Sequence, residues 1–367
     1  MSLLESFNFL LAQRQIILSS FQCEPKNLAD NTQSLLITLK MLLQEGGVSH
    51  PLLNAKTSTD FISALESEAE YSIENQLVIM QLLLHLHYKH APDKQVDVFQ
   101  KLFESSTVNS DKYLPYLALI ASQQNIDKIP FRTTNKMSVQ IHQYLLFCLY
   151  RGKRLKRKGA AEVLEVSMTP MTTLYIEMLM ETPKEPLALY TDFVELALCN
   201  NVLFDIFITS LEEPIFTQLV NLMSQDNSMR ARVIELMGYS GFSKFVPFLA
   251  RAMQQPAQTL AAFKALRTIL GPELDHAVPY QWQFEDDQSK RCEYLQFYSA
   301  KLLNRWLLLA PKMLNVRMIN GIEVNIETID KIISHSSPVH QQVARLHKLR
   351  LQGVISQPAS KQFKLAS

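Results

Sequence analysis

The chain contains few glycines and no long apolar run. Its 9 glycines among 367 residues argue against sandwiches, barrels and doubly wound sheets, which need glycine at many tight turns, and favour helices. The longest apolar runs, at residues 77–86 and 302–310, are each interrupted by polar side chains. Both fall below the roughly 18 residues that would predict a membrane span. The sequence therefore predicts a helical protein with no membrane span.

Paired cysteines are also lacking. The four cysteines are far apart and form no C-x-x-C motif: Cys23, Cys148, Cys199 and Cys292. This spacing disfavours a disulfide framework or a zinc site and fits reduced thiols. The first residues have no basic segment and include an early acid, Glu5, unlike a signal peptide. We expect a cytoplasmic protein.

The chain has almost no excess of either sign of charge, because 36 Lys and Arg residues balance 35 Asp and Glu residues and the formal net charge is +1. This balance gives no global attraction to nucleic acid or to acidic membranes. Hydrophobic residues make up 47% and charged residues 19%, enough apolar material to fold. A chain of 367 residues exceeds the usual size of one core, so we expect two domains or a stack of repeats.

Three helix-length segments follow one another closely within residues 227–271. The first carries apolar residues at i, i+4, i+7 and i+8: Met229, Val233, Leu236 and Met237. Residues 238–241, Gly-Tyr-Ser-Gly, separate it from a second amphipathic segment at 242–254, and a third covers 260–270. Short helices of this kind cannot bury their apolar faces alone and need a neighbouring pair, as in an α-solenoid.

Helical patterns recur along the rest of the chain. Further helices are predicted at residues 3–19, 28–43, 61–66, 73–89, 95–103, 112–122, 138–150, 160–166, 171–180, 187–199, 204–210 and 215–223. Around Asn320-Gly321 the alternation within residues 316–326 fits either a small hairpin or an irregular loop between helices. An aromatic stripe around Phe297 and Trp306 is interpreted as core or as a solenoid cap.

The predicted fold is all-α: an α-solenoid of HEAT-like helical hairpins with an irregular helical N-terminal region. Breaks in the pattern divide the chain into three parts. Residues 1–134 form the irregular helical region, residues 135–277 the HEAT-like repeats, and residues 278–367 a C-terminal helical capping unit with a polar tail.

From residue 229 to about residue 351 the chain resembles a family of HEAT-repeat proteins encoded with bacterial type VI secretion systems. Residues 229–241 look like the family's first repeat helix and turn, and residues 245–249 like its second helix. Residues 260–271 are similar to the helix that closes the repeat block, and residues 339–346 to a closing segment rich in Gln and Arg. The resemblance covers about a third of the chain. It implies a role in secretion and supplies no catalytic residues.

One cluster of basic residues stands out. Six cations fall within eight positions: Arg151, Lys153, Arg154, Lys156, Arg157 and Lys158. They fit a solvated loop or a cationic helix end, which the helix dipole favours. They also fit docking of an acidic protein surface, or attraction to nucleic-acid phosphate. No aromatic interleaving or base-reading module supports nucleic acid. We take the six residues as the candidate partner-binding site.

Signatures of catalysis and of metal binding are missing. The chain has no Walker-type loop, G-x-S-x-G elbow, H-E-x-x-H helix or G-x-G-x-x-G turn. His85, His87 and His90 do not suggest a metal site, since residues two apart on a helix point to different sides. We expect no metal, no cofactor and no small-molecule substrate.

These patterns favour a non-enzymatic helical scaffold that assists a type VI secretion system by protein–protein recognition. Two alternatives stay open. One is a general HEAT-like adaptor unrelated to secretion, and the other is an enzyme whose active site has no recognisable motif.

Overall fold

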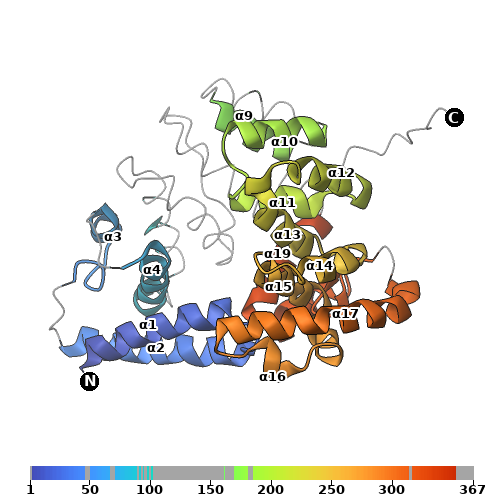
Figure 1. Ribbon diagram of the computed structural model, residues 1–367. Helices are drawn as coiled ribbons and strands as arrows, with labels where there is room; N and C mark the ends of the chain where they lie inside the picture. The colour runs from blue at the N-terminus through green and yellow to red at the C-terminus, as the bar shows by residue number, and fades with distance from the viewer. Residues whose placement is uncertain are drawn as a thin grey trace. The chain divides into compact units, whose positions relative to one another are not determined.

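A computed structural model describes residues 2–45, 50–66, 71–88, 169–180, 185–313 and 316–352, with single positions at 91, 94, 97, 98, 101 and 161. This part of the chain is mostly helical (Figure 1). Its two strands form one small antiparallel ladder. The all-α fold class is therefore confirmed for the described residues. The helices predicted at 95–103, 112–122, 138–150 and 160–166 lie wholly or mostly outside them.

The described helices belong to two compact units. The first unit contains α1 (Leu3–Ser19), α2 (Pro25–Glu45), α3 (Ser58–Glu66), α4 (Ile73–Tyr88) and α9 (Pro170–Leu179). The second contains α10 (Pro186–Glu195), α11 (Val202–Ser210), α12 (Glu213–Met223), η1 (Asn227–Met229), α13 (Arg230–Ser240), η2 (Ser243–Phe245), α14 (Val246–Ala252), α15 (Thr259–Leu270), η3 (Gly271–His276), α16 (Tyr280–Gln283), α17 (Gln288–Met313), β1 (Met318–Ile319), β2 (Ile322–Glu323), α18 (Ile329–His335) and α19 (Pro338–Leu351).

The unit boundaries differ in position from the predicted domain boundaries. The predicted division between residues 277 and 278 falls inside the second unit, between η3 and α16. The predicted division between residues 134 and 135 lies outside the described residues.

In the first unit, α1 and α2 form a helical hairpin. Phe7 and Leu11 of α1 are buried, and polar side chains join the two helices. The side-chain amide of Asn31 donates to the carbonyl of Leu10 at 3.0 Å, and Arg14 Nη1 donates to Thr32 Oγ1 at 2.8 Å. Because Asn31 is itself buried, this hydrogen bond offsets the desolvation of its amide and fixes the pairing of the helices.

In the second unit, alternate helices form a row. Helix α11 packs against α13, α13 against α15, and α15 against α17 (Figure 1). Helix α14 packs against α15 and α17. The C-terminal segment does not extend this row, because α19 packs against α11 and β1 packs against α15. Residues far apart in sequence therefore share one core.

Helices α13 and α15 approach each other at Gly238. A Cβ atom added to Gly238 would lie 2.7 Å from the Cα and 2.9 Å from the Cβ of Ala265. The sequence pattern had placed a turn at residues 238–241, but α13 continues through Ser240 and ends at Gly241, whose φ is 70°. The predicted position of the turn was wrong because Gly238 serves helix packing, whereas Gly241 supplies the left-handed residue that ends the helix.

Residues 318–323 form the hairpin that the sequence left open. Met318 pairs with Glu323, and Ile319 pairs with Ile322. Asn320 and Gly321 have φ values of 54° and 75°, which a two-residue turn of type I′ requires. The backbone N–H groups of Asn320 and Gly321 donate to the carbonyls of Thr268 and Ile269 at 2.8 and 2.9 Å. The turn therefore caps the C-terminal end of α15.

Arg317, just before this hairpin, caps two more helices. Its guanidinium donates from Nη1 to the carbonyls of Thr209, at 2.8 Å, and Ser240, at 3.2 Å, and from Nη2 to Leu211. These carbonyls lie at the C-terminal ends of α11 and α13, where helices leave acceptors without partners. We call residues 317–321 the shared cap, because they satisfy carbonyls at the ends of α11, α13 and α15.

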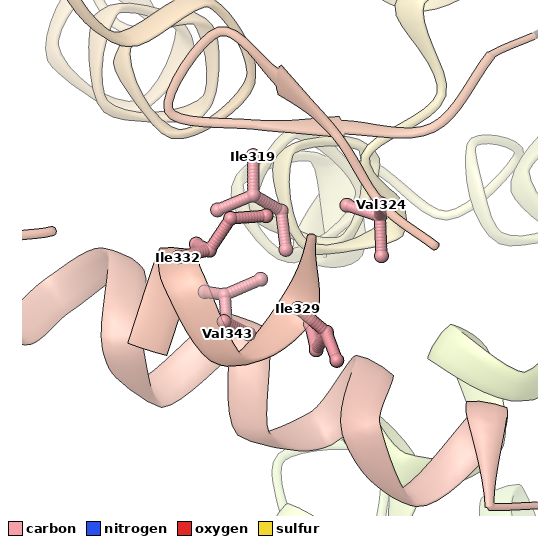
Figure 2. Packing of buried hydrophobic residues seen from close by; sticks show 6 residues of the cluster. Ile319, Val324, Ile329, Ile332 and Val343 are labelled. Carbon is pink, nitrogen blue, oxygen red and sulfur yellow. The ribbon is translucent and has the colours of Figure 1, made fainter. Parts of the chain in front are cut away.

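The hairpin and the last two helices enclose a small apolar core. Its buried residues are Ile319, Val324, Ile329, Ile332, Val343 and Ala344. Figure 2 shows Ile319 of the hairpin, Ile332 of α18 and Val343 of α19 close together, with Val324 and Ile329 to one side. This core holds the shared cap against α19.

Two buried histidines of α19 reach the same helix ends. His340 Nε2 lies 3.0 Å from the carbonyl of Arg267, and His347 Nε2 lies 2.7 Å from the carbonyl of Tyr239. Burial lowers the pKa of both imidazoles, that of His340 to about 4. Neutral imidazoles donating to helix carbonyls therefore complete the capping of α13 and α15.

Candidate protein-interaction surface

The predicted basic site lies outside the described residues. Its six cations, at positions 151, 153, 154, 156, 157 and 158, fall in a part of the chain that the structure does not describe. Their role in docking a partner stays a prediction.

The structure reveals a different surface, formed by α10 and α12. Both helices begin with a proline in the first turn, Pro186 and Pro214, where the missing N–H group costs nothing and the fixed φ suits a helix. On its inner side α10 buries Phe193, whose ring lies 5.1 Å from that of Phe204 and 5.3 Å from that of Phe207. These aromatic contacts fix α10 on α11.

The outer sides of α10 and α12 border an open groove. It has a volume of about 430 Å³ and is lined by Tyr190, Thr191, Val194, Leu222, Gln225 and Asp226. Val194 is 49% exposed and Leu222 is 44% exposed. Leu187, one helical heptad before Val194, is also exposed, at 46%. Helix α10 therefore carries apolar side chains on a second face that no described helix covers.

This surface is acidic. Residues 185–229 contain no Lys, Arg or His and seven carboxylates: Glu185, Asp192, Glu195, Asp205, Glu212, Glu213 and Asp226. Two of these have cationic partners, since Asp205 pairs with Arg232 and Glu213 pairs with Lys244. Within the described part of the chain, Glu185, Glu195, Glu212 and Asp226 form no salt bridge.

Asp226 places a carboxylate on the groove itself. Its Oδ1 accepts a hydrogen bond from the backbone N–H of Ser228 at 2.8 Å, which caps η1. Hydrogen bonds from the side chain and backbone of Ser228 lower the pKa of this exposed carboxyl. Burial, with the charges of Cys199 and Asp226 acting in the same direction, raises the pKa of the Tyr190 phenol. The groove thus presents an anion and a neutral aromatic ring at neutral pH.

Runs of charge in the sequence do not indicate this surface, because its signal is the absence of cations over 45 residues. The acids are spaced along three helices and their connections, so no short window contains a cluster. The exposed position of Val194 and Leu222 depends on how α10 and α12 pack, which periodicity alone does not fix.

A partly buried ionic network joins α11 to α13. Arg232 donates from Nε to the carbonyl of Cys199 at 3.0 Å, from Nη1 to Glu235 Oε2 at 2.6 Å, and from Nη2 to Asp205. Tyr239 donates to Glu235 Oε1 at 3.0 Å. Burial raises the pKa of the Asp205 carboxyl from its ordinary 3.8 to about 6, although the charge of Arg232 acts against this rise.

This raised pKa predicts a specific dependence of stability on pH. Between about pH 4 and pH 6 the folded chain holds a proton on Asp205 that the unfolded chain releases, so the free energy of unfolding falls as the pH rises. Relative to Asp205→Asn, which does not titrate, the wild type should lose at most about 3 kcal/mol between pH 4.5 and pH 7, because one pKa unit corresponds to about 1.4 kcal/mol. Urea unfolding of both proteins across this range measures the difference. A wild type that gains stability relative to Asp205→Asn as the pH rises would contradict the raised pKa.

The described residues offer no cluster of metal ligands. Among them, no three or more His, Cys, Asp and Glu side chains come together in a way that could hold a metal ion. Cys23, Cys199 and Cys292 are free thiols, and Cys148 lies outside the described residues. None of the described helices combines the length and apolar character needed to cross a membrane.

Comparison of the chain with family models, with curated proteins and with solved structures finds no match. The local geometry of the chain therefore carries the functional argument.

Proposed function

We propose that this chain is a non-enzymatic helical scaffold that recognises other proteins and assists a bacterial type VI secretion system. The observation that carries the recognition role is the groove between α10 and α12, where Val194 and Leu222 are half exposed beside the carboxylate of Asp226. Exposed apolar residues with a polar border are typical of protein interaction sites. The link to secretion is supported by the resemblance of residues 229–351 to HEAT-repeat proteins of these systems.

A HEAT-like solenoid is the architecture that we propose for the repeats. The row of α11, α13 and α15, with α14 packed beside α15, supports it, because alternate helices form one layer of such stacks. The free thiols of Cys23, Cys199 and Cys292 fit our proposal of a cytoplasmic location. A HEAT-like adaptor unrelated to secretion is the second candidate, since the groove favours protein recognition without identifying the pathway.

Affinity purification from the native cell tests the proposal. Tagged wild-type chain is expected to retain components of a type VI secretion system. A variant in which Lys153, Arg154, Lys156 and Arg157 are replaced by Glu tests whether the basic segment contributes, and its loss of these partners with unchanged thermal unfolding would support that role. Purification of other proteins without any secretion component would favour the adaptor unrelated to secretion. Purification of no protein from cells that express the secretion system would refute the scaffold role.

A further inference from the structure

We infer that the groove between α10 and α12 binds a basic amphipathic helix of a partner protein. Apolar side chains of this helix would sit against Tyr190, Val194 and Leu222, and its Lys or Arg side chains would lie near Asp226. The inference rests on the proposed role in protein recognition and is independent of the link to secretion.

The shape of the groove favours a helix as the occupant. The groove is open, and four of its six lining residues come from two helices, α10 and α12, while Gln225 and Asp226 follow α12. A third helix can pack on two others when the ridges of side chains on the third helix fit into the grooves between the side chains of the other two. Leu187 and Val194 are seven residues apart, which places them on one face of α10 two turns apart. Anchors at i, i+3, i+4 and i+7 of an incoming helix match this spacing.

A second face of α10 carries apolar side chains that no described helix covers. Leu189 and Phe193 are buried in the core of the unit, whereas Leu187 and Val194 are 46% and 49% exposed. A surface helix of a globular protein normally has one apolar stripe, directed to the core. Removal of these additional apolar residues from water by a bound partner lowers the free energy of the complex.

The charge of the surface specifies a basic partner. Residues 185–229 carry no cation, and four of their carboxylates, Glu185, Glu195, Glu212 and Asp226, form no salt bridge within the described residues. The lowered pKa of Asp226 keeps this carboxylate charged at neutral pH. Such a surface repels nucleic acid, anionic lipid and acidic helices, and it attracts Lys and Arg. The half-buried ring of Tyr190 adds a face on which a cation can rest.

Fluorescence anisotropy with a labelled amphipathic peptide, LKKLLKLLKKLLKL, tests the inference on the full chain. The wild type is expected to bind this peptide, and the affinity should fall as the salt concentration rises. The double substitution Val194→Ser and Leu222→Ser should weaken binding at least about tenfold, because it removes the central apolar contacts. Asp226→Asn with Glu195→Gln should weaken it about fivefold, as expected for exposed charges. Asparagine at position 226 keeps the cap on η1.

Matched substitutions on α17 serve as controls. Phe297 is 76% exposed, so Phe297→Ser removes an exposed apolar side chain away from the groove, and Glu293→Gln removes an exposed carboxylate. Both should leave the affinity unchanged, and all variants should keep the thermal unfolding of the wild type. The same peptide with Glu in place of Lys should not bind.

Three results would overturn the inference. The first is equal affinity of the wild type and the Val194→Ser, Leu222→Ser variant for the basic peptide. The second is equal binding of the acidic peptide. The third is a wild-type dimer that this variant dissociates in analytical ultracentrifugation, which would assign the groove to a second copy of the chain. Peptide binding in the groove by a chain that retains no secretion component would refute the proposed secretion role alone.

Discussion

Replacing Arg317 with methionine is expected to lower the free energy of unfolding of the second unit by about 3 to 5 kcal/mol. The side chain is 9% exposed, and its loss leaves the carbonyls of Thr209, Leu211 and Ser240 without this donor. It also removes the contact of the guanidinium with Phe242, whose ring centroid lies 4.0 Å from Cζ. Burial and the charge of Arg350 lower the pKa of Arg317 to about 9, so the side chain is still cationic at neutral pH.

Urea unfolding of Arg317→Met and Arg317→Lys measures the effect. Lysine keeps the charge but lacks the planar guanidinium group that reaches three carbonyls. The free energy of unfolding of Arg317→Lys should therefore lie between those of the wild type and Arg317→Met. Arg251→Met is the control, because Arg251 is exposed on α14 and forms no ion pair among the described residues. A loss below about 1 kcal/mol for Arg317→Met would show that water satisfies these carbonyls equally well.

Substituting Gly238 with alanine is expected to destabilise the second unit by about 2 to 3 kcal/mol. Helix propensity alone predicts that Gly238→Ala stabilises the protein, since alanine is favoured over glycine inside a helix by about 1 kcal/mol. The close contact decides the outcome, because the new Cβ would lie 2.7 Å from the Cα of Ala265. The backbones of α13 and α15, which pack closely together, must then separate.

Ala231→Gly in the same helix provides the comparison for Gly238→Ala. Ala231 is exposed in the first turn of α13, so this substitution reports propensity without packing and should cost at most about 1 kcal/mol. Thermal unfolding of both variants measures the two effects. A more stable Gly238→Ala protein would mean that the helices tolerate the added methyl group, and that Gly238 has no packing role.

Local helix patterns could be predicted from the sequence, because they depend on spacing within one segment. The apolar spacing from Met229 to Met237 correctly indicated α13, and the predicted segment at 3–19 coincides with α1. The interpretation of the aromatic stripe on α17 as core was only partly right. Leu302 and Trp306 are buried, but Phe297 is 76% exposed, because residues on one stripe of a long helix need not meet the same neighbour.

Features that depend on several distant segments could not be predicted. Nothing near Arg317 in sequence indicates that its side chain meets Thr209 and Ser240, more than 70 residues away. Gly238 looked like part of a turn because a glycine at a helix crossing and a glycine at a helix end have the same local sequence signal. The groove likewise depends on how α10 and α12 are placed in the fold. Its acidic character comes from carboxylates in a segment that contains no Lys, Arg or His.

The shared cap at residues 317–321 has a consequence for how the protein is made. The ends of α11, α13 and α15 are completed by residues that the ribosome adds about fifty positions after the end of α15, the last of these helices. In a linear repeat array each newly synthesised hairpin can settle on its predecessor. Here the ends of α11, α13 and α15 lack these hydrogen-bond partners until residues 317–321 have been added, so we expect a chain truncated upstream of the cap to be less stable than the intact second unit.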